Sequence, residues 1–177
     1  MRTVLAAAAF CAATALAAPM AQAVDFADMP VGCQWTFQYW NGMRLTHTYV
    51  GRVSGLYDVR TTVAGHPDRL VNNMWFNRSG DMVERASQNG KWEKFSPASC
   101  YTQVGHCEML LTNARGVHRH IDSTTQRNGN HYDQYWHLRG RGHLHHVAYT
   151  EGRFGIIVKG MYRGKPVTVS RFRHCGR

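Results

Sequence analysis

The chain has 177 residues, of which 44% are hydrophobic and 18% are charged, and its formal net charge is +10. This composition is too apolar for a disordered chain, and the length suits one domain rather than several. The positive charge predicts anionic partners but indicates no reaction.

The first 23 residues have the pattern of an export signal. Arg2 precedes an apolar stretch, Val4 to Ala18, which is followed by Pro19 and by small residues at Ala21 and Ala23. The stretch is too short for a membrane-spanning helix, and no later run is long enough for one. We therefore expect cleavage after Ala23 and a periplasmic or secreted protein of the bacterial envelope. Its single domain, residues 24–177, keeps 20 basic and 11 acidic residues, a net charge of +9.

Turn dipeptides that contain glycine recur along residues 24–177, and they predict where strands end. The segments between them are rich in β-branched and aromatic residues, and several alternate in polarity, as Cys33–Tyr39 does. Apolar residues at helical spacing do not recur over a comparable length. We predict an all-β antiparallel meander of roughly 11 or 12 strands, with no substantial helix after the signal. The dipeptides are Asn41-Gly42, Ser54-Gly55, Ser79-Gly80, Asn89-Gly90, Asn128-Gly129, Glu151-Gly152 and Arg163-Gly164.

A meander of this length has two edges whose backbone groups need partners. Curling into a closed or partly open barrel provides them, and a β-sandwich is the alternative. The segment from Phe95 to Cys107, which contains Pro97 and two cysteines, is the one extended interruption of the turn pattern.

Four cysteines remain after cleavage, since Cys11 belongs to the signal. An oxidising compartment favours disulfides, and four cysteines allow three pairings. Cys100 and Cys107 are separated by six residues that a local loop can close, which leaves Cys33 with Cys175. The alternative, a metal–thiolate site, lacks the closely spaced cysteine pair that zinc sites use.

Histidines concentrate between His118 and His146. If Asn128 and Gly129 are the central residues of a two-residue hairpin turn, Arg127 faces Asn130 and His120 faces His137. One face of the hairpin and of the next strand then carries imidazoles and carboxylates, and the other face is apolar. The polar face contains His118, His120, Asp122, Asp133, Tyr135, His137 and His146.

Imidazoles that face one another across a sheet can bind zinc or copper. The candidate metal ligands are His118, His120, His137 and His146. The alternative is that these residues form the solvated face of an antiparallel sheet and that no metal binds.

Arginine outnumbers lysine 16 to 4 in residues 24–177, and its planar donor group suits phosphates, carboxylates and acidic polysaccharides. The candidate anion-binding residues are Arg139 and Arg141, and Arg171 and Arg173. Because the basic residues form no stripe or known motif, we expect an anionic envelope surface or a small ligand as partner, and no specific nucleic acid.

Motifs of nucleophilic catalysis are missing from the sequence, in particular the Gly-x-Ser-x-Gly turn. We therefore predict a barrel-like binding or structural protein of the envelope, with an unknown ligand and without catalysis. The alternative is a transition-metal-binding protein, or a metal-dependent hydrolase, that uses the region His118–His146.

Overall fold

The computed structural model describes residues 24–88, 91–101, 103–139, 144–162 and 165–176. This part of the chain forms twelve β-strands and two short 3-10 helices, and it contains no α-helix. The strands are β1 (Gln34–Tyr39), β2 (Arg44–Val53), β3 (Leu56–Val63), β4 (His66–Phe76), β5 (Met82–Ser87), β6 (Trp92–Ser96), β7 (Gly105–Asn113), β8 (His118–Asn128), β9 (His131–Leu138), β10 (Leu144–Glu151), β11 (Ile157–Tyr162) and β12 (Lys165–Arg173). The helices are η1 (Ala98–Tyr101) and η2 (Arg153–Gly155).

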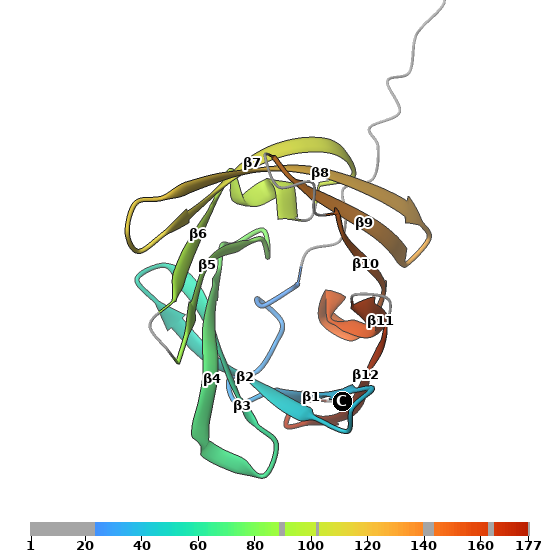
Figure 1. Cartoon of the computed structure of the whole chain (residues 1–177). Helices are drawn as coiled ribbons and strands as arrows, with labels where there is room; N and C mark the ends of the chain where they lie inside the picture. The colour runs from blue at the N-terminus through green and yellow to red at the C-terminus, as the bar shows by residue number, and fades with distance from the viewer. Residues whose placement is uncertain (1–23, 89–90, 102, 140–143, 163–164, 177) are drawn as a thin grey trace, which may run out of the picture.

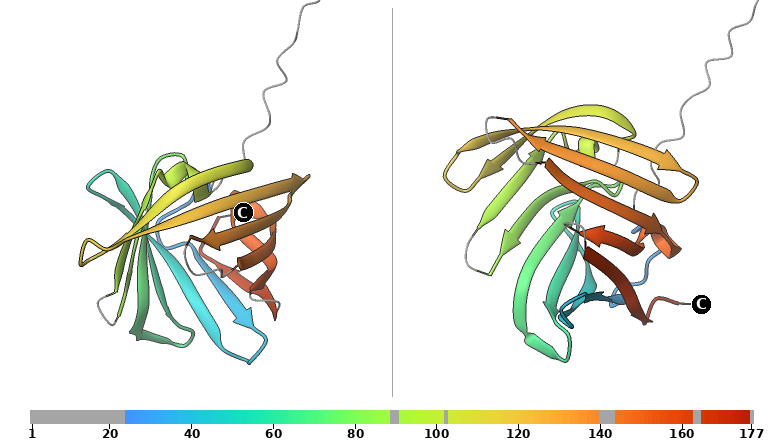
Figure 2. Two further views of the ribbon diagram at one scale, coloured as in Figure 1. Left: turned by 45° about the horizontal axis from the view of Figure 1, so that its top comes forward. Right: turned by 45° about the vertical axis from the view of Figure 1, so that its right-hand side comes forward.

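Every strand pairs antiparallel with the next strand in the chain, and β1 also pairs with β12. The strands therefore follow one another around a ring (Figure 1). The views in Figure 2 show the same order from two other directions, with the long strands β7, β8 and β9 side by side. The predicted all-β antiparallel meander is confirmed. All twelve strands belong to one sheet, whereas the alternative of a sandwich requires two.

Tight turns at glycines set several of the strand ends, as the sequence predicts. The predicted turns Asn89-Gly90 and Arg163-Gly164 lie outside the described residues. Between β2 and β3, Ser54 and Gly55 both have positive φ angles, 52° and 84°, and Val53 pairs with Leu56. Two such residues in succession match the twist of the flanking strands, which is why an asparagine, serine or glycine pair is favoured there. A two-residue loop of this kind fixes the register of the hairpin.

The segment before β1 lies inside the ring (Figure 1, blue). Phe26 is buried, and its ring contacts the rings of Tyr49, Tyr57 and Phe76 at centroid distances of 5.4, 5.1 and 5.0 Å. These three residues lie near the β2–β3 and β4–β5 turns, so the segment fills that end of the ring. We call residues 24–33 the plug and this end the plugged end.

Both predicted disulfides are present, Cys33–Cys175 and Cys100–Cys107. Cys33, Cys100 and Cys175 are buried in the main apolar core. The first bridge joins residues 142 positions apart, next to the pairing of β1 with β12. The two bridges are consistent with an oxidising, extracytoplasmic location.

The predicted register of the β8–β9 hairpin is wrong by two residues. Asn128 pairs with His131, so the two loop residues are Gly129 and Asn130 rather than Asn128 and Gly129. Gly129 has a φ of 62°, and Asn130 is not among the residues with positive φ. Glycine thus occupies the first central position of the turn, as in a type II′ turn, whereas the prediction placed it second.

Since the error is an even number of residues, the two faces of the hairpin stay as predicted. Ile121, Tyr132 and Gln134 are buried on the inner face, and His118, His120 and His137 are exposed on the outer face. His120 nevertheless does not lie opposite His137. Asp122 lies opposite His137 instead. His120 is next to Arg139 on the neighbouring segment, and the Arg139 backbone N–H donates a hydrogen bond to the His120 carbonyl.

Candidate anion-binding pocket

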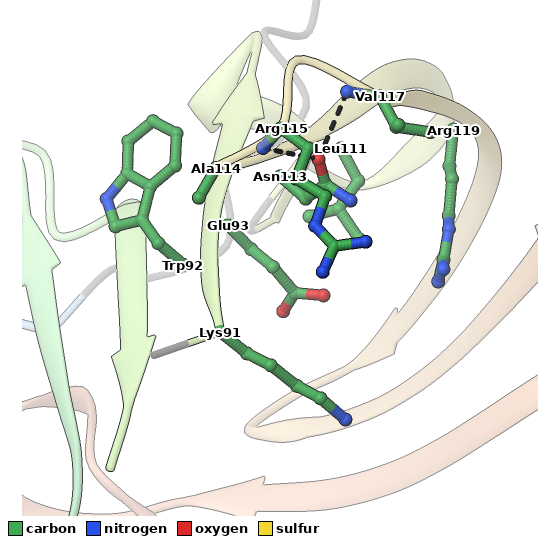
Figure 3. A pocket seen from close by; sticks show the side chains of 9 residues that line it. All are labelled: Lys91, Trp92, Glu93, Leu111, Asn113, Ala114, Arg115, Val117 and Arg119. Atoms are coloured by element: carbon green, nitrogen blue, oxygen red, sulfur yellow. Dashed lines mark hydrogen bonds between the residues drawn. The ribbon is translucent and has the colours of Figure 1, made fainter. Parts of the chain in front are cut away.

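A pocket of about 470 Å³ lies at the end of the ring opposite the plug, where the β5–β6 and β7–β8 turns meet. Figure 3 shows its side chains, which come from β6, β7, β8 and the two turns. The lining residues are Lys91, Trp92, Glu93, Leu111, Asn113, Ala114, Arg115, Val117 and Arg119.

Strand register places the pocket against the core. Phe95 pairs with Leu111, and Leu111 pairs with Arg119. Directly paired residues point to the same side of a sheet. Phe95 is buried in the core and Leu111 packs against it, so Arg119 extends from the inner face towards this end. The pocket therefore has an apolar floor at Leu111 and a cation beside it.

The β7–β8 turn holds Arg115 at the pocket. The Asn113 side-chain oxygen accepts hydrogen bonds from the N–H groups of Arg115 and Val117, at 2.9 and 3.0 Å (Figure 3, dashed). The backbone of Asn113 also bonds to Gly116 and Val117, and Gly116 has a φ of 73°. An asparagine that bonds the backbone two and four residues on is a common way to fix a turn. The position of the Arg115 backbone is thus set by its own turn.

Three cations and one carboxylate line the pocket. Figure 3 shows the side chains of Lys91, Arg115 and Arg119 around the space that also contains the Glu93 carboxylate. Glu93 accepts hydrogen bonds from Nε of Arg85, at 3.0 Å, and from Nη2 of the same side chain. Because Arg85 balances the charge of Glu93, the charges of Lys91, Arg115 and Arg119 are left to attract an anion.

Three of the four predicted anion-binding arginines lie away from this pocket. Arg171 and Arg173 are exposed on β12, opposite Thr36 and Gln34 of β1. Arg141 lies outside the described residues. Arg139 Nη2 is 2.8 Å from an Asp122 oxygen and 3.3 Å from a Glu108 oxygen. The charge of Arg139 is therefore already paired with two carboxylates. Their role in anion binding stays a prediction.

The predicted metal ligands belong to three neighbouring strands, β8, β9 and β10. His118 and His120 are exposed on β8, and the His118 imidazole hydrogen-bonds the Thr112 hydroxyl at 2.9 Å. His137 is exposed on β9, and the backbone of His146 on β10 pairs with Tyr135. A site formed by these four histidines stays a prediction.

A different cluster on the same outer face brings an imidazole and two carboxylates together. One ligand atom each from His106, Glu108 and Asp122 lies within 4.8 Å of the others. The Arg139 hydrogen bond holds the pKa of Asp122 below its usual value, and the nearby charges of Arg139, His106 and His137 act in the same direction, against desolvation. Asp122 is therefore ionised at neutral pH.

Sequence reasoning missed Lys91, Arg115 and Arg119, and also His106 and Glu108. The three pocket cations belong to two turns and a strand that become neighbours only when β6, β7 and β8 pair. One signal in the sequence could have found two of them. Asn113 and Gly116 mark a turn that contains Arg115, and Arg119 is three residues after Gly116. The His-x-Glu spacing of His106 and Glu108 likewise places both on one face of a strand.

Comparison of the chain with protein-family models, curated proteins and solved structures found no match. In the part of the chain that the structure describes, no helix is long and apolar enough to cross a membrane.

Proposed function

We propose that the protein is an exported, non-catalytic binding protein of the bacterial envelope whose ring of strands serves as a barrel-like scaffold. Its ligand is a small organic anion, held in the pocket between the β5–β6 and β7–β8 turns. The observation that carries the proposal is the set of three cations, Lys91, Arg115 and Arg119, beside an apolar floor.

The chemistry of the lining defines the ligand class. Guanidinium and ammonium groups bind carboxylates, sulfates and phosphates through charge-assisted hydrogen bonds. Leu111 and Val117 add apolar surface, which favours an anion with an apolar part over an inorganic ion. The volume of about 470 Å³ suits a small molecule rather than a polymer segment.

The test uses a fluorescent organic anion, anilinonaphthalenesulfonate, with the uncharged phenylnaphthylamine as its matched probe. The double variant R115Q/R119Q removes two pocket charges, and R171Q/R173Q removes two exposed charges from β12. We expect the first variant to weaken binding of the anion by about tenfold or more, and the second by less than about twofold. Neither variant should change binding of the uncharged probe.

Equal weakening by the two double variants would mean that net charge, and not the pocket, attracts the anion. That result, or saturable binding that both variants leave intact, contradicts the proposal. Thermal melting of each variant controls for folding, since all four arginines are exposed and exposed substitutions change stability little.

Affinity for anionic envelope surfaces is a separate expectation from the net charge of +9, and it stays a prediction. Such binding should fall steeply with salt because exposed charges are screened. It should rise below about pH 6, where histidines gain protons. Sedimentation with vesicles that contain an anionic lipid, at low and high salt, measures it.

A further inference from the structure

A cluster of one imidazole and two carboxylates lies on the outer face of the sheet, away from the pocket. We infer that His106 and Glu108 of β7 and Asp122 of β8 form a zinc site. It differs from the four-histidine site that the sequence suggests, because it uses one imidazole and two carboxylates. It is also independent of the proposed anion pocket, which lies at one end of the ring.

Strand register brings the three ligands together. His106 and Glu108 are two residues apart on β7, so they point to the same face. Glu108 pairs directly with Asp122, and Asp122 pairs on its other side with His137 of β9. Side chains that are paired in this way have their Cβ atoms about 5 Å apart. Backbone pairing therefore brings the three side chains to one patch of the outer face.

The distances are close to those of a metal site. The ligand atoms of the three residues lie within 4.8 Å of one another, and His106 Nε2 is 3.9 Å from Glu108 Oε1. Zinc bonds of about 2.0–2.2 Å in tetrahedral geometry put ligand atoms roughly 3.4 Å apart. The side chains of His106 and Glu108 are 62% and 60% exposed, so rotation about their own bonds can close the gap.

The two carboxylates already bind a cation, the guanidinium of Arg139. Its Nη2 contacts one oxygen of Asp122 at 2.8 Å and Oε2 of Glu108 at 3.3 Å. Oε1 of Glu108, which faces His106, is not used in this contact. Arg139 thus orients both carboxylates and also competes for them by its positive charge.

The donor set selects the metal. Calcium and magnesium prefer six or more oxygen ligands, and magnesium keeps several waters. One imidazole nitrogen with two carboxylate oxygens suits zinc, with water in the fourth position.

The experiment is a zinc titration of the exported protein, purified without a histidine tag and followed by calorimetry and by the imidazole NMR signals of His106. We expect one equivalent to bind with a dissociation constant below about 10 µM. H106Q and D122N should each weaken binding by about tenfold or more. R139Q should tighten binding, because it removes the competing charge and keeps a hydrogen-bond donor.

Controls separate this site from the alternatives. H118Q/H120Q removes two imidazoles from the same face of β8 and should leave zinc binding unchanged, as should R115Q/R119Q in the pocket. If H118Q/H120Q abolishes zinc binding while H106Q does not, zinc binds at the predicted four-histidine site, and the inference is overturned. It is also overturned if neither the parent nor R139Q binds zinc saturably, or if several weak equivalents bind regardless of H106Q and D122N.

Discussion

The imidazole ring of His47 lies nearly parallel to the indole ring of Trp35 inside the ring of strands, with centroids 5.6 Å apart and planes 10° apart. The edge of Phe37 meets the same imidazole, and the Thr61 hydroxyl hydrogen-bonds its Nδ1 at 2.9 Å. Its Nε2 is buried without a hydrogen-bond partner among the described residues. Burial lowers the pKa of His47 to about 4. His47 is therefore neutral in the folded protein, and its protonation opposes folding.

The folded-state pKa of about 4 makes stability depend on pH. The unfolded chain, with a His47 pKa near its usual value of about 6.5, binds this proton first as the pH falls. The free energy of unfolding is therefore full above about pH 6.5 and decreases between about pH 6.5 and pH 4. We expect a loss of about 2 kcal/mol between pH 7.5 and pH 5 that is absent in H47Q. Urea unfolding at the two pH values measures it.

H66Q is the control for that measurement, because His66 is exposed at the start of β4. It should keep the pH dependence of the parent. If H47Q and H66Q show the same dependence on pH, the buried imidazole is not its source.

Phe26 anchors the plug, and its removal should destabilise the whole protein. F26A leaves a cavity among Tyr49, Tyr57 and Phe76, which should lower the free energy of unfolding by about 3 to 5 kcal/mol. V31A changes a residue of the same segment that is 67% exposed, and it should cost less than about 0.5 kcal/mol. Chemical unfolding compares the two variants. Equal stability of F26A and V31A would show that the plug contributes nothing to the core.

The two disulfides should differ in their contribution to stability because their loops differ in length. In the loop-entropy account, the bridge across 142 positions contributes about 5 kcal/mol and the bridge across 7 positions about 2.5 kcal/mol. C33S/C175S should therefore unfold at much lower denaturant concentration than C100S/C107S. Unfolding curves of both double variants under oxidising conditions measure the difference. The reverse order would mean that local packing around Cys100 outweighs loop length.

The β8–β9 turn provides a test of register in solution. Gly129 has a φ of 62°, so G129A should cost about 1 to 2 kcal/mol of unfolding free energy. Asn128 lies in β8, where a β-branched residue is accommodated, so N128V should change stability by less than about 0.5 kcal/mol. A large loss in N128V would instead support the register in which Asn128 has positive φ.

Turn glycines and alternating polarity were sufficient to predict the fold class, because each short hairpin is specified by adjacent residues. Cys100 and Cys107 were also predictable, since the chain between them is short. The inner and outer faces of β8 and β9 followed from alternation alone. The turn between them did not, because an Asn-Gly-Asn sequence allows glycine at either central position, and only the packed strands select one.

The candidate sites were harder to predict than the fold, for a physical reason. Arg119 and Lys91 line one pocket because β6, β7 and β8 pair in a particular register, and Glu108 lies opposite Asp122 for the same reason. Which side chains face each other across two strands changes when the register shifts by one residue. Which segments form strands does not change with such a shift. Arg139 also illustrates the limit: its sequence context suggested a free cation, and two carboxylates of other strands bind it.

Because β1 pairs with β12, the sheet can form its last strand pair only after the C-terminal strand is available. If the chain passes through an export channel from its N-terminus, as the predicted signal implies, the plug emerges before any strand that will enclose it. Phe26 then has no packing partner on β4 until β4 has emerged. The edge of β1 stays unpaired until β12 has emerged, about 140 residues later, which is the separation of Cys33 and Cys175. Such non-local contacts slow folding and leave apolar surface and an unpaired strand edge exposed meanwhile. A chain in which β1–β11 have formed and β12 has not would expose that strand edge, and an exposed edge favours aggregation.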